Sequence, residues 1–400
     1  MRIVGWTAAV VATFAFGMFV AHYRVWPLQQ ILYSKQYVTW KTGLLQHSWP
    51  DKGFFAPVNF DQMIQVRDAG AVTSKRAQLR DYIWGRDQNG NLHSRAKSTR
   101  PPSAEALSYL GTTMGAPDLS LVVDGRYGYR GEAFVWFTKQ KSDCLFIYAQ
   151  GHGSELLDAR HQNERQLLKT VLGGGCDILT VAMPLLGVTQ KVLRANTRFG
   201  PLVAQTHDDL AYLASDDFNP LSLFFVHIRA AIDELQGVGR YRSITMAGLS
   251  GGGWTTTVYA AIDPRINASF SVAGSLPVIF RLADQRNEGD WEQRNDGLLQ
   301  IADYLDLYVL GAAGGRQVGL VYNFHDGCCF GGNAALAFRP ALMGAVKRLN
   351  GRIDVAIDDT SFGHEMSAVT TQRIASVALS RPTHAPDGGG EIEDEPIAAQ

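Results

Sequence analysis

Short apolar runs alternate with longer amphipathic stretches from Leu119 to Leu379. Eight of the runs have the length and composition of strands, and the stretches between them repeat apolar positions at helical spacing. This alternation predicts an α/β fold, with a mostly parallel eight-stranded sheet and helices on both of its faces. The first two strands are joined by a short connection, so we expect them to pair as a hairpin. The predicted strands are Leu119–Val123, Ala133–Thr138, Cys144–Ala149, Asp177–Ala182, Ser243–Ala247, Ala268–Ala273, Val318–Phe324 and Ile353–Ile357.

Helical periodicity predicts one helix ahead of the sheet and five among or after its strands. The leading helix, Thr73–Trp84, is expected to have Thr73 or Ser74 as its N-cap. Two spacings, residues 184–220 and 277–316, are too long for a simple crossover and are expected to form lid-like inserts. The remaining predicted helices are Leu156–Leu172, Leu221–Leu235, Gly253–Ala261, Ala334–Leu349 and Ala368–Leu379.

The chain begins with an apolar segment, Ile3–Tyr23, that has no formal charge and is long enough to cross a bilayer as a helix. We expect an uncleaved membrane anchor rather than a cleaved signal peptide, because Phe19 occupies a position where cleavage needs a small residue. Basic residues flank both ends of this segment, so the charge count does not decide which end faces the cytoplasm. Because a large trailing domain can be translocated whatever its charge, we expect it on the extracytoplasmic side.

Composition divides the rest of the chain into three parts. Residues 26–115 form a leading segment that could be a separate layer or a cover, and its end contains the linker-like stretch Arg95–Ser103. Residues 116–380 form the α/β domain, and residues 381–400 form an acidic tail that we expect to be disordered. The anchor occupies residues 1–25.

Charge and cysteine content exclude several function classes. The net charge is −1, which leaves no basic surface of the kind that nucleic-acid binding needs. The four cysteines are too scattered for a disulfide-stapled scaffold, and Cys328 and Cys329 are expected to be small buried residues rather than a vicinal disulfide or redox pair. Neither a zinc-type HExxH pattern nor a dinucleotide-binding fingerprint occurs, so no metal or cofactor is predicted.

The candidate chemistry begins with the sequence Gly248-Leu249-Ser250-Gly251-Gly252, between a predicted strand and a predicted helix. A serine at such a turn adopts strained backbone geometry, needs small residues two positions away on either side, and exposes its hydroxyl at the end of the sheet. The alternatives for this glycine-rich turn are an idle hydroxyl or a phosphate-binding turn. We predict that Ser250 is a nucleophile.

A serine nucleophile needs a histidine to accept its proton and a carboxylate to orient that histidine. Asp326 and His364 follow the last two predicted strands, so the order along the chain is Ser250, Asp326, His364. Asp358 and Asp359 are rivals for Asp326, but their position suggests that they shape the loop before His364. In the first insert, His207 could touch substrate, but we expect it to cap the stretch that follows.

These residues resemble the α/β-hydrolase superfamily, in which the nucleophile follows the fifth strand, the acid the seventh and the histidine the eighth. The resemblance covers residues 119–379. It implies that the loop after the third strand, Gln150-Gly151-His152-Gly153, completes an oxyanion hole. The backbone N–H groups of Gly251 and His152 are then the expected donors. Gln150 departs from the family pattern, where histidine is common.

The resemblance implies a serine hydrolase, with Ser250, His364 and Asp326 as its triad and a carboxylic ester as its substrate. The apolar segment Ile3–Tyr23 makes the expected hydrolase a membrane-anchored one. The ester could be a small molecule or lipid-like. Acyl transfer and peptide cleavage use the same triad and stay open. Two functions of a different class also stay open: a hydrolase-fold binding module without catalysis, and an anchored scaffold that assembles through Trp26–Ser103.

Overall fold

The structure is a computed structural model that describes residue 13 and residues 51–85, 97–99, 114–152, 162–187, 189, 191–236, 241–281, 289–361 and 363–380. The described residues from 51 onward belong to a compact unit that begins at Trp49. The predicted anchor, apart from Thr13, and the predicted acidic tail lie outside the described residues. Within the described part of the chain, no helix combines the length and the apolar character needed to cross a bilayer.

A nine-stranded sheet forms the centre of this unit, in the order β1-β2-β3-β5-β4-β8-β9-β10-β11. The strands from β5 to β11 in that order are parallel, whereas β1, β2 and β3 pair antiparallel with their neighbours. All eight predicted strands are present, including the hairpin of β2 and β3, and the three-residue edge strand β1 was not predicted. The strands are β1 (Lys97–Thr99), β2 (Leu119–Asp124), β3 (Arg130–Trp136), β4 (Cys144–Ala149), β5 (Asp177–Val181), β8 (Ser243–Leu249), β9 (Ala268–Val272), β10 (Gln317–Asn323) and β11 (Arg352–Asp358).

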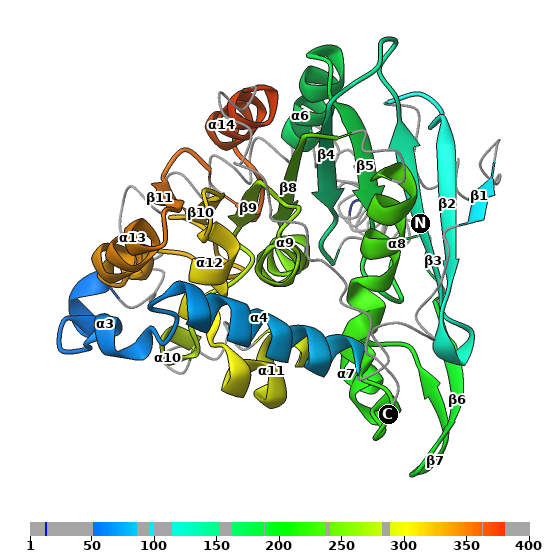
Figure 1. Cartoon of the computed structure of the whole chain (residues 1–400), viewed down its shortest axis with the longest axis horizontal. Coiled ribbons are helices and arrows are strands. Elements are labelled where there is room, and N and C mark those ends of the chain that lie inside the picture. The colour runs from blue at the N-terminus through cyan, green and yellow to red at the C-terminus, as the bar shows by residue number, and fades with distance from the viewer. Residues whose placement is uncertain are drawn as a thin grey trace, which may run out of the picture. The chain divides into compact units, whose positions relative to one another are not determined.

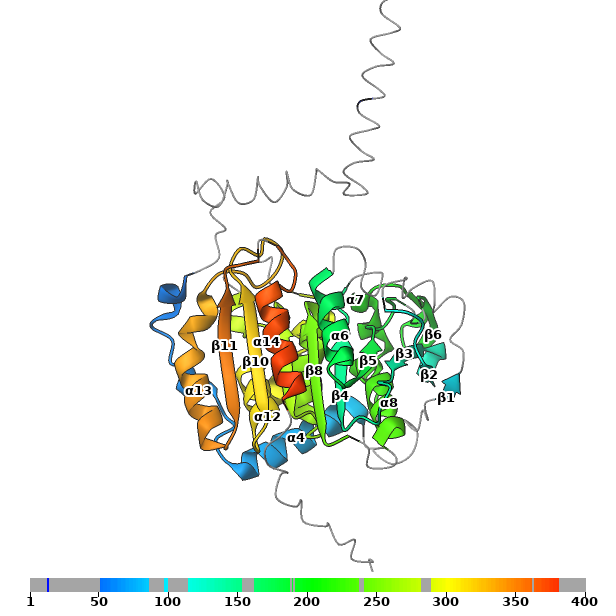
Figure 2. The ribbon, with the colours of Figure 1, turned by 90° about the horizontal axis from the view of Figure 1, so that it is seen from above.

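Helices cover both faces of the sheet, as predicted, because successive strand residues point to opposite faces and both faces are apolar. On one face, α6 (Gln162–Gly173) and α14 (Ala368–Leu379) lie side by side (Figures 1 and 2) and close the smaller apolar core. The larger core lies on the other face, where Figure 1 shows α9 and α12. The helices of this face are α8 (Val226–Gln236), α9 (Gly251–Ile262), α12 (Tyr304–Ala312) and α13 (Arg339–Arg348).

The first insert contains a second, two-stranded sheet, β6 (Leu193–Thr197) and β7 (Gly200–Ala204), followed by short helices. The second insert contains the buried helix α12, which packs against α9 and connects β9 to β10. No helix was predicted there. Every residue of α12 is buried, so it has no polar face to produce a helical periodicity. The short helices are α7 (His207–Leu210), α10 (Val278–Arg281), α11 (Asp296–Ile301), η3 (Ala211–Leu213), η4 (Pro220–Phe224), η6 (Trp291–Arg294) and η7 (Ala334–Ala337).

The described part of the leading segment, residues 51–85, packs onto the larger core as a cover. It contains η1 (Lys52–Phe55), α3 (Phe60–Met63) and α4 (Ala69–Trp84), and α4 contacts α9 and α11. The guanidinium groups of Arg76 and Arg80 donate to the last carbonyl groups of α9, at 3.0 and 2.8 Å. These bonds satisfy carbonyls that a helix end leaves without partners. The observed N-cap of α4 is Asp68, so the prediction of Thr73 or Ser74 was wrong by five or six residues.

A buried carboxylate ties this cover to the core. One oxygen of Asp306 in α12 accepts hydrogen bonds from the backbone N–H groups of Gln65 and Val66, at 2.8 and 2.9 Å. Its other oxygen lies 3.3 Å from the ammonium group of Lys75. Because Asp306 is almost fully buried, water cannot replace these interactions.

We predict that Asp306→Ala lowers the free energy of unfolding by about 3 kcal/mol, because it leaves two buried backbone donors without an acceptor and removes the carboxylate that pairs with Lys75. Urea unfolding of the full-length chain measures this. Asp61→Ala, at an exposed position in α3, is the matched control and should change stability by less than about 0.5 kcal/mol. Equal shifts for the two variants would show that Asp306 does not hold the cover.

Candidate active site

Ser250 occupies the sharp turn between β8 and α9, as predicted. Its backbone has φ 59° and ψ −128°, a conformation that non-glycine residues rarely adopt. Two backbone hydrogen bonds fix this turn: the N–H of Ser250 donates to the carbonyl of Val272, at 2.9 Å, and its carbonyl accepts from Trp254, at 3.0 Å. The turn therefore holds Ser250 at the end of β8 and at the N-terminus of α9.

The glycines two positions from Ser250 are required by close packing. A Cβ atom on Gly248 would lie 2.3 Å from the carbonyl carbon of Gly252, and a Cβ atom on Gly252 would lie 2.0 Å from the carbonyl oxygen of Ala149. Both contacts are far shorter than any real Cβ contact, and both involve backbone atoms that cannot move aside. The requirement for small residues that the motif predicted therefore has a direct structural cause.

The loop after β4 packs against this turn. A Cβ atom on Gly151 would lie 3.1 Å from the Cβ of Ser250 and 3.3 Å from the backbone nitrogen of Gly251. The ring of His152 lies over Gly251, since a Cβ atom there would be 2.6 Å from the ring's Cε1. The two predicted oxyanion donors, Gly251 and His152, are thus neighbours, whereas Gly153 lies outside the described residues.

Asp326 and His364 come together in the loops after β10 and β11. The Nδ1 atom of His364 lies 2.6 Å from a carboxylate oxygen of Asp326, which is completely buried. A carboxylate at Nδ1 keeps the proton on that nitrogen and leaves Nε2 as the basic atom. The Nε2 atom is buried and has no hydrogen-bond partner among the described residues.

Asn323, at the end of β10, positions the histidine loop. Its side-chain amide donates to the carbonyl groups of Gly363 and Glu365, at 3.2 and 2.7 Å, on either side of His364. Asn323 was not predicted as a site residue, and only its place at a strand end two positions before His325 could have suggested it. Asp358 accepts from Thr360 in the same loop, at 2.9 Å, and from Thr370 in α14, at 2.7 Å, so it shapes the loop as expected.

The cysteines correct a prediction. Cys328 and Cys329 form a vicinal disulfide and are exposed or half-buried, so they are not the buried apolar pair that the sequence suggested. Their N–H groups donate to the second oxygen of Asp326, at 2.8 and 3.1 Å. Cys144 and Cys176 form a second disulfide beside the start of β4. The sequence alone reveals neither pairing. Cys328 and Cys329 are adjacent, which does not by itself indicate a bond, and Cys144 and Cys176 lie in segments that meet only in the fold.

A cluster of titratable groups lies beside the loop that carries His152. The Nε2 atom of His152 lies 2.6 Å from Asp290 and 3.6 Å from Glu292, and the Nδ1 atom of His207 lies 3.0 Å from Glu292. Burial of the His152 ring by itself lowers its pKa, but the hydrogen bonds to the two carboxylates outweigh burial and raise that pKa to about 9.

His207 was expected to be a helix cap, but Thr206 and Asp209 cap α7 instead.

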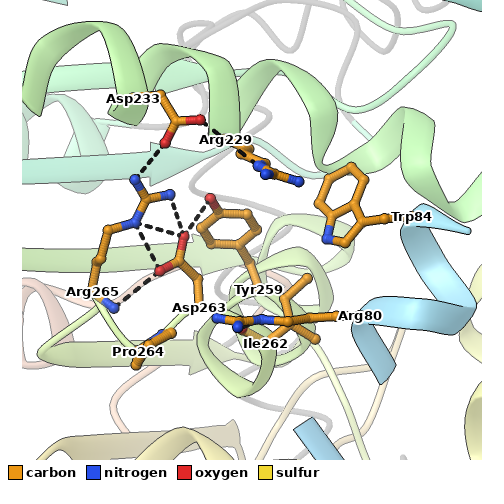
Figure 3. Close-up of a pocket in the computed structure, with 9 residues that line it drawn as sticks. All are labelled: Arg80, Trp84, Arg229, Asp233, Tyr259, Ile262, Asp263, Pro264 and Arg265. Carbon is orange, nitrogen blue, oxygen red and sulfur yellow. Dashed lines mark hydrogen bonds and ion pairs between the residues drawn. The ribbon is translucent and has the colours of Figure 1, made fainter. Parts of the chain in front are cut away.

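A separate pocket of about 390 Å³ lies at the opposite end of α9 from Ser250 (Figure 3). The helices α4, α8 and α9 provide most of its lining. Four of its five charged groups, all but Arg80, are paired with one another. Arg265 binds the carboxylate of Asp263 at 2.7 Å and also contacts Asp233, and the hydroxyl of Tyr259 donates to Asp263 at 2.8 Å. Because it contains none of the residues around Ser250, this pocket is not part of the candidate active site.

Comparisons with known proteins find solved structures whose fold is similar to that of this chain. No family model matches the chain, and no curated protein matches its sequence. A methylesterase of known structure is 14% identical over 79% of this chain and 65% of its own, with a TM-score of 0.51. Acetyl xylan esterase 1 from Thermoanaerobacterium sp. is 17% identical over 80% of this chain and 96% of its own, with a TM-score of 0.48. At such identities the likeness concerns the fold.

We predict that Gly252→Ala destabilises the full-length chain by at least about 3 kcal/mol, because the new methyl group would overlap the carbonyl of Ala149. Gly173→Ala at the end of α6 is the matched control, since a Cβ atom there meets nothing within 4 Å. Thermal unfolding compares the two variants with the wild type. Equal midpoints for Gly252→Ala and Gly173→Ala would contradict the packing described here.

Proposed function

Because this chain has the α/β-hydrolase fold, we propose that it is a serine hydrolase that cleaves carboxylic esters. The observation that supports this most strongly is the hydrogen bond between Asp326 and His364, in loops at the same sheet edge as Ser250. Ser250 follows β8, and the pair follows β10 and β11, which are parallel to β8 within one run of neighbouring strands. The carboxyl ends of parallel strands meet at one edge, where α/β proteins gather their functional residues.

In this proposal, His364 accepts the hydroxyl proton of Ser250 at Nε2 while the serine oxygen attacks the ester carbonyl. Asp326 holds the histidine and stabilises its charged form. The carbonyl oxygen gains negative charge, which the N–H groups of Gly251 and His152 stabilise by about 3 kcal/mol each. The proton then passes from Nε2 to the leaving alcohol. Water, activated in the same way, hydrolyses the acyl-enzyme and regenerates the free serine.

The buried carboxylate of Asp326 is well suited to this role. Its two oxygens are both engaged, one by His364 and the other by the N–H groups of Cys328 and Cys329. These three hydrogen bonds fix the orientation of the carboxylate. Asp359, the remaining rival from the sequence, is exposed.

A solved structure with the same fold is described as a methylesterase, and this supports ester cleavage over amide cleavage. Acyl transfer and peptide cleavage stay open with the same three residues, because the triad chemistry is shared. The second candidate function is a non-catalytic binding module, which would keep the fold without an activated serine.

We further propose that Ile3–Tyr23 anchors the enzyme in a membrane with its hydrolase unit on the extracytoplasmic side. The length and apolar character of the segment support the anchor. The disulfide between Cys144 and Cys176 supports the location, since stable disulfides belong to oxidising compartments. An anchored hydrolase would act on esters at or near the membrane, including lipid-like ones.

The triad is tested by reacting the full-length chain with a fluorophosphonate and locating the adduct by peptide mass. We expect labelling at Ser250 that is abolished in Ser250→Ala and reduced at least ~100-fold in rate in His364→Ala, because the serine is then no longer activated. Asp326→Asn should lower kcat on a small aryl ester by about 10⁴, because the histidine adopts the wrong tautomer.

Asp359→Asn is the matched control for Asp326→Asn and should keep kcat within about two-fold of wild type. A folded wild-type protein that is not labelled at Ser250 would refute the hydrolase and favour the binding module. Equal losses in the two asparagine variants would instead remove Asp326 from the triad.

The anchor is tested by washing membranes from expressing cells with alkaline carbonate, which strips peripheral proteins. The full-length chain should stay with the membranes, whereas a chain with Val11→Lys and Ala15→Lys in the apolar segment should be released, because charges at mid-bilayer cost about 3 kcal/mol each. Release of the unmodified chain would refute anchoring without affecting the proposal for Ser250.

A further inference from the structure

Two histidines and two carboxylates converge beside the loop that carries His152, and the proposed reaction does not need them as a group. They come from three segments that are far apart in the sequence: His152 follows β4, His207 begins α7 in the first insert, and Asp290 and Glu292 lie in the second insert. One donor atom from each of the four lies within 4.8 Å of all the others. We call these four residues the His–carboxylate cluster.

The hydrogen bonds of His207 imply that a proton or a metal ion lies between its ring and Glu292. Its Nε2 atom lies 2.9 Å from the carbonyl oxygen of Pro184, which can only accept, so Nε2 carries the proton. In the neutral ring the Nδ1 atom then carries a lone pair and can only accept. This atom lies 3.0 Å from a carboxylate oxygen of Glu292. Two acceptors attract at this distance only when a proton or a metal ion lies between them.

Glu292 gives an independent indication. Its side chain has no exposed surface, and its Oε2 atom has no hydrogen-bond partner in the described part of the chain. A buried carboxylate with an unsatisfied oxygen costs several kcal/mol unless a cation compensates for the lost hydration. The Oε1 atom of the same group already faces both histidines of the cluster.

We propose that the His–carboxylate cluster binds one zinc ion through His152, His207, Asp290 and Glu292. Imidazole nitrogens and carboxylate oxygens are ordinary zinc ligands, and metal–ligand distances of ~2.0 Å in a tetrahedral site place ligand atoms ~3.3 Å apart. The four separations between histidine nitrogens and carboxylate oxygens are 2.6, 3.0, 3.6 and 3.8 Å, which bracket that value. The bond from His207 to Pro184 is the orienting contact that metal-bound histidines make with their other nitrogen.

Four protein ligands leave no open position, which is typical of a structural site rather than a catalytic one. The zinc ion would join both inserts to the loop after β4, and the ring of His152 lies directly over Gly251. If the proposed function is correct, the ion therefore fixes the backbone of the second oxyanion donor. Zinc binding itself does not depend on the chemistry of Ser250.

The test is zinc binding by the full-length chain. Metal is removed with dipicolinate, the chain is returned to metal-free buffer, and zinc is then added. We expect about one zinc per chain by elemental mass spectrometry, and a dissociation constant at least ~10-fold weaker in Asp290→Asn and in His207→Ala, measured by competition with a chromophoric chelator. Asp290 is partly exposed, with 44% of its side chain accessible, so its variant tests the site even if His207→Ala unfolds.

Two controls identify the ligands. Asp208→Asn removes the charge of a neighbouring exposed carboxylate outside the cluster. It keeps a side-chain oxygen that can accept from the N–H of Trp291, which lies 2.9 Å from Asp208, so it should bind zinc as the wild type does. The double variant Cys328→Ser, Cys329→Ser should also bind as the wild type, which excludes the cysteines near His364. A folded wild-type chain that binds no zinc, or equal affinity in Asp290→Asn and Asp208→Asn, would overturn the proposal. Ser250→Ala should bind zinc normally, so failure of the serine chemistry and failure of the zinc site are separate results.

Discussion

Close packing between the glycines around Ser250 and the end of β4 is the constraint on which the site depends. Gly252 packs against the carbonyl of Ala149, so α9 begins directly against the neighbouring strand, and the turn that leads into it has a positive φ at Ser250. The same contact brings the loop of Gly151 and His152 against the serine turn. One packing requirement thus positions both the proposed nucleophile and the proposed oxyanion donors.

The rest of the site is built from strand ends that lie side by side. The parallel strands β8, β9, β10 and β11 end at one edge of the sheet, and the loops that follow them carry the residues of the proposed triad. Rigidity comes from buried hydrogen bonds rather than from the loops themselves. Asn323 clamps both sides of His364, and the carboxylate of Asp326 is held by two backbone N–H groups as well as by the histidine.

The sequence predicted the eight principal strands and the residues of the proposed triad because both have local signals. Strand-length apolar runs mark the sheet, and Ser250 lies in a glycine pattern with a known geometric cause. Helix α12 was not predicted, because it is buried on all sides and so shows no alternation of apolar and polar positions at helical spacing. The His–carboxylate cluster escaped because its members meet only through the tertiary fold, so no spacing in the sequence could reveal His207 beside Glu292.

The central claim is that Ser250, His364 and the N–H groups of Gly251 and His152 surround one reacting carbonyl. A crystal structure of the full-length chain bearing a phosphonate on its nucleophile tests this directly, because the phosphonyl oxygen occupies the place of the oxyanion. The account predicts a bond to the Ser250 oxygen and a phosphonyl oxygen within ~3 Å of both N–H groups. A phosphonate attached to another side chain, or an oxygen pointing away from both donors, would contradict it.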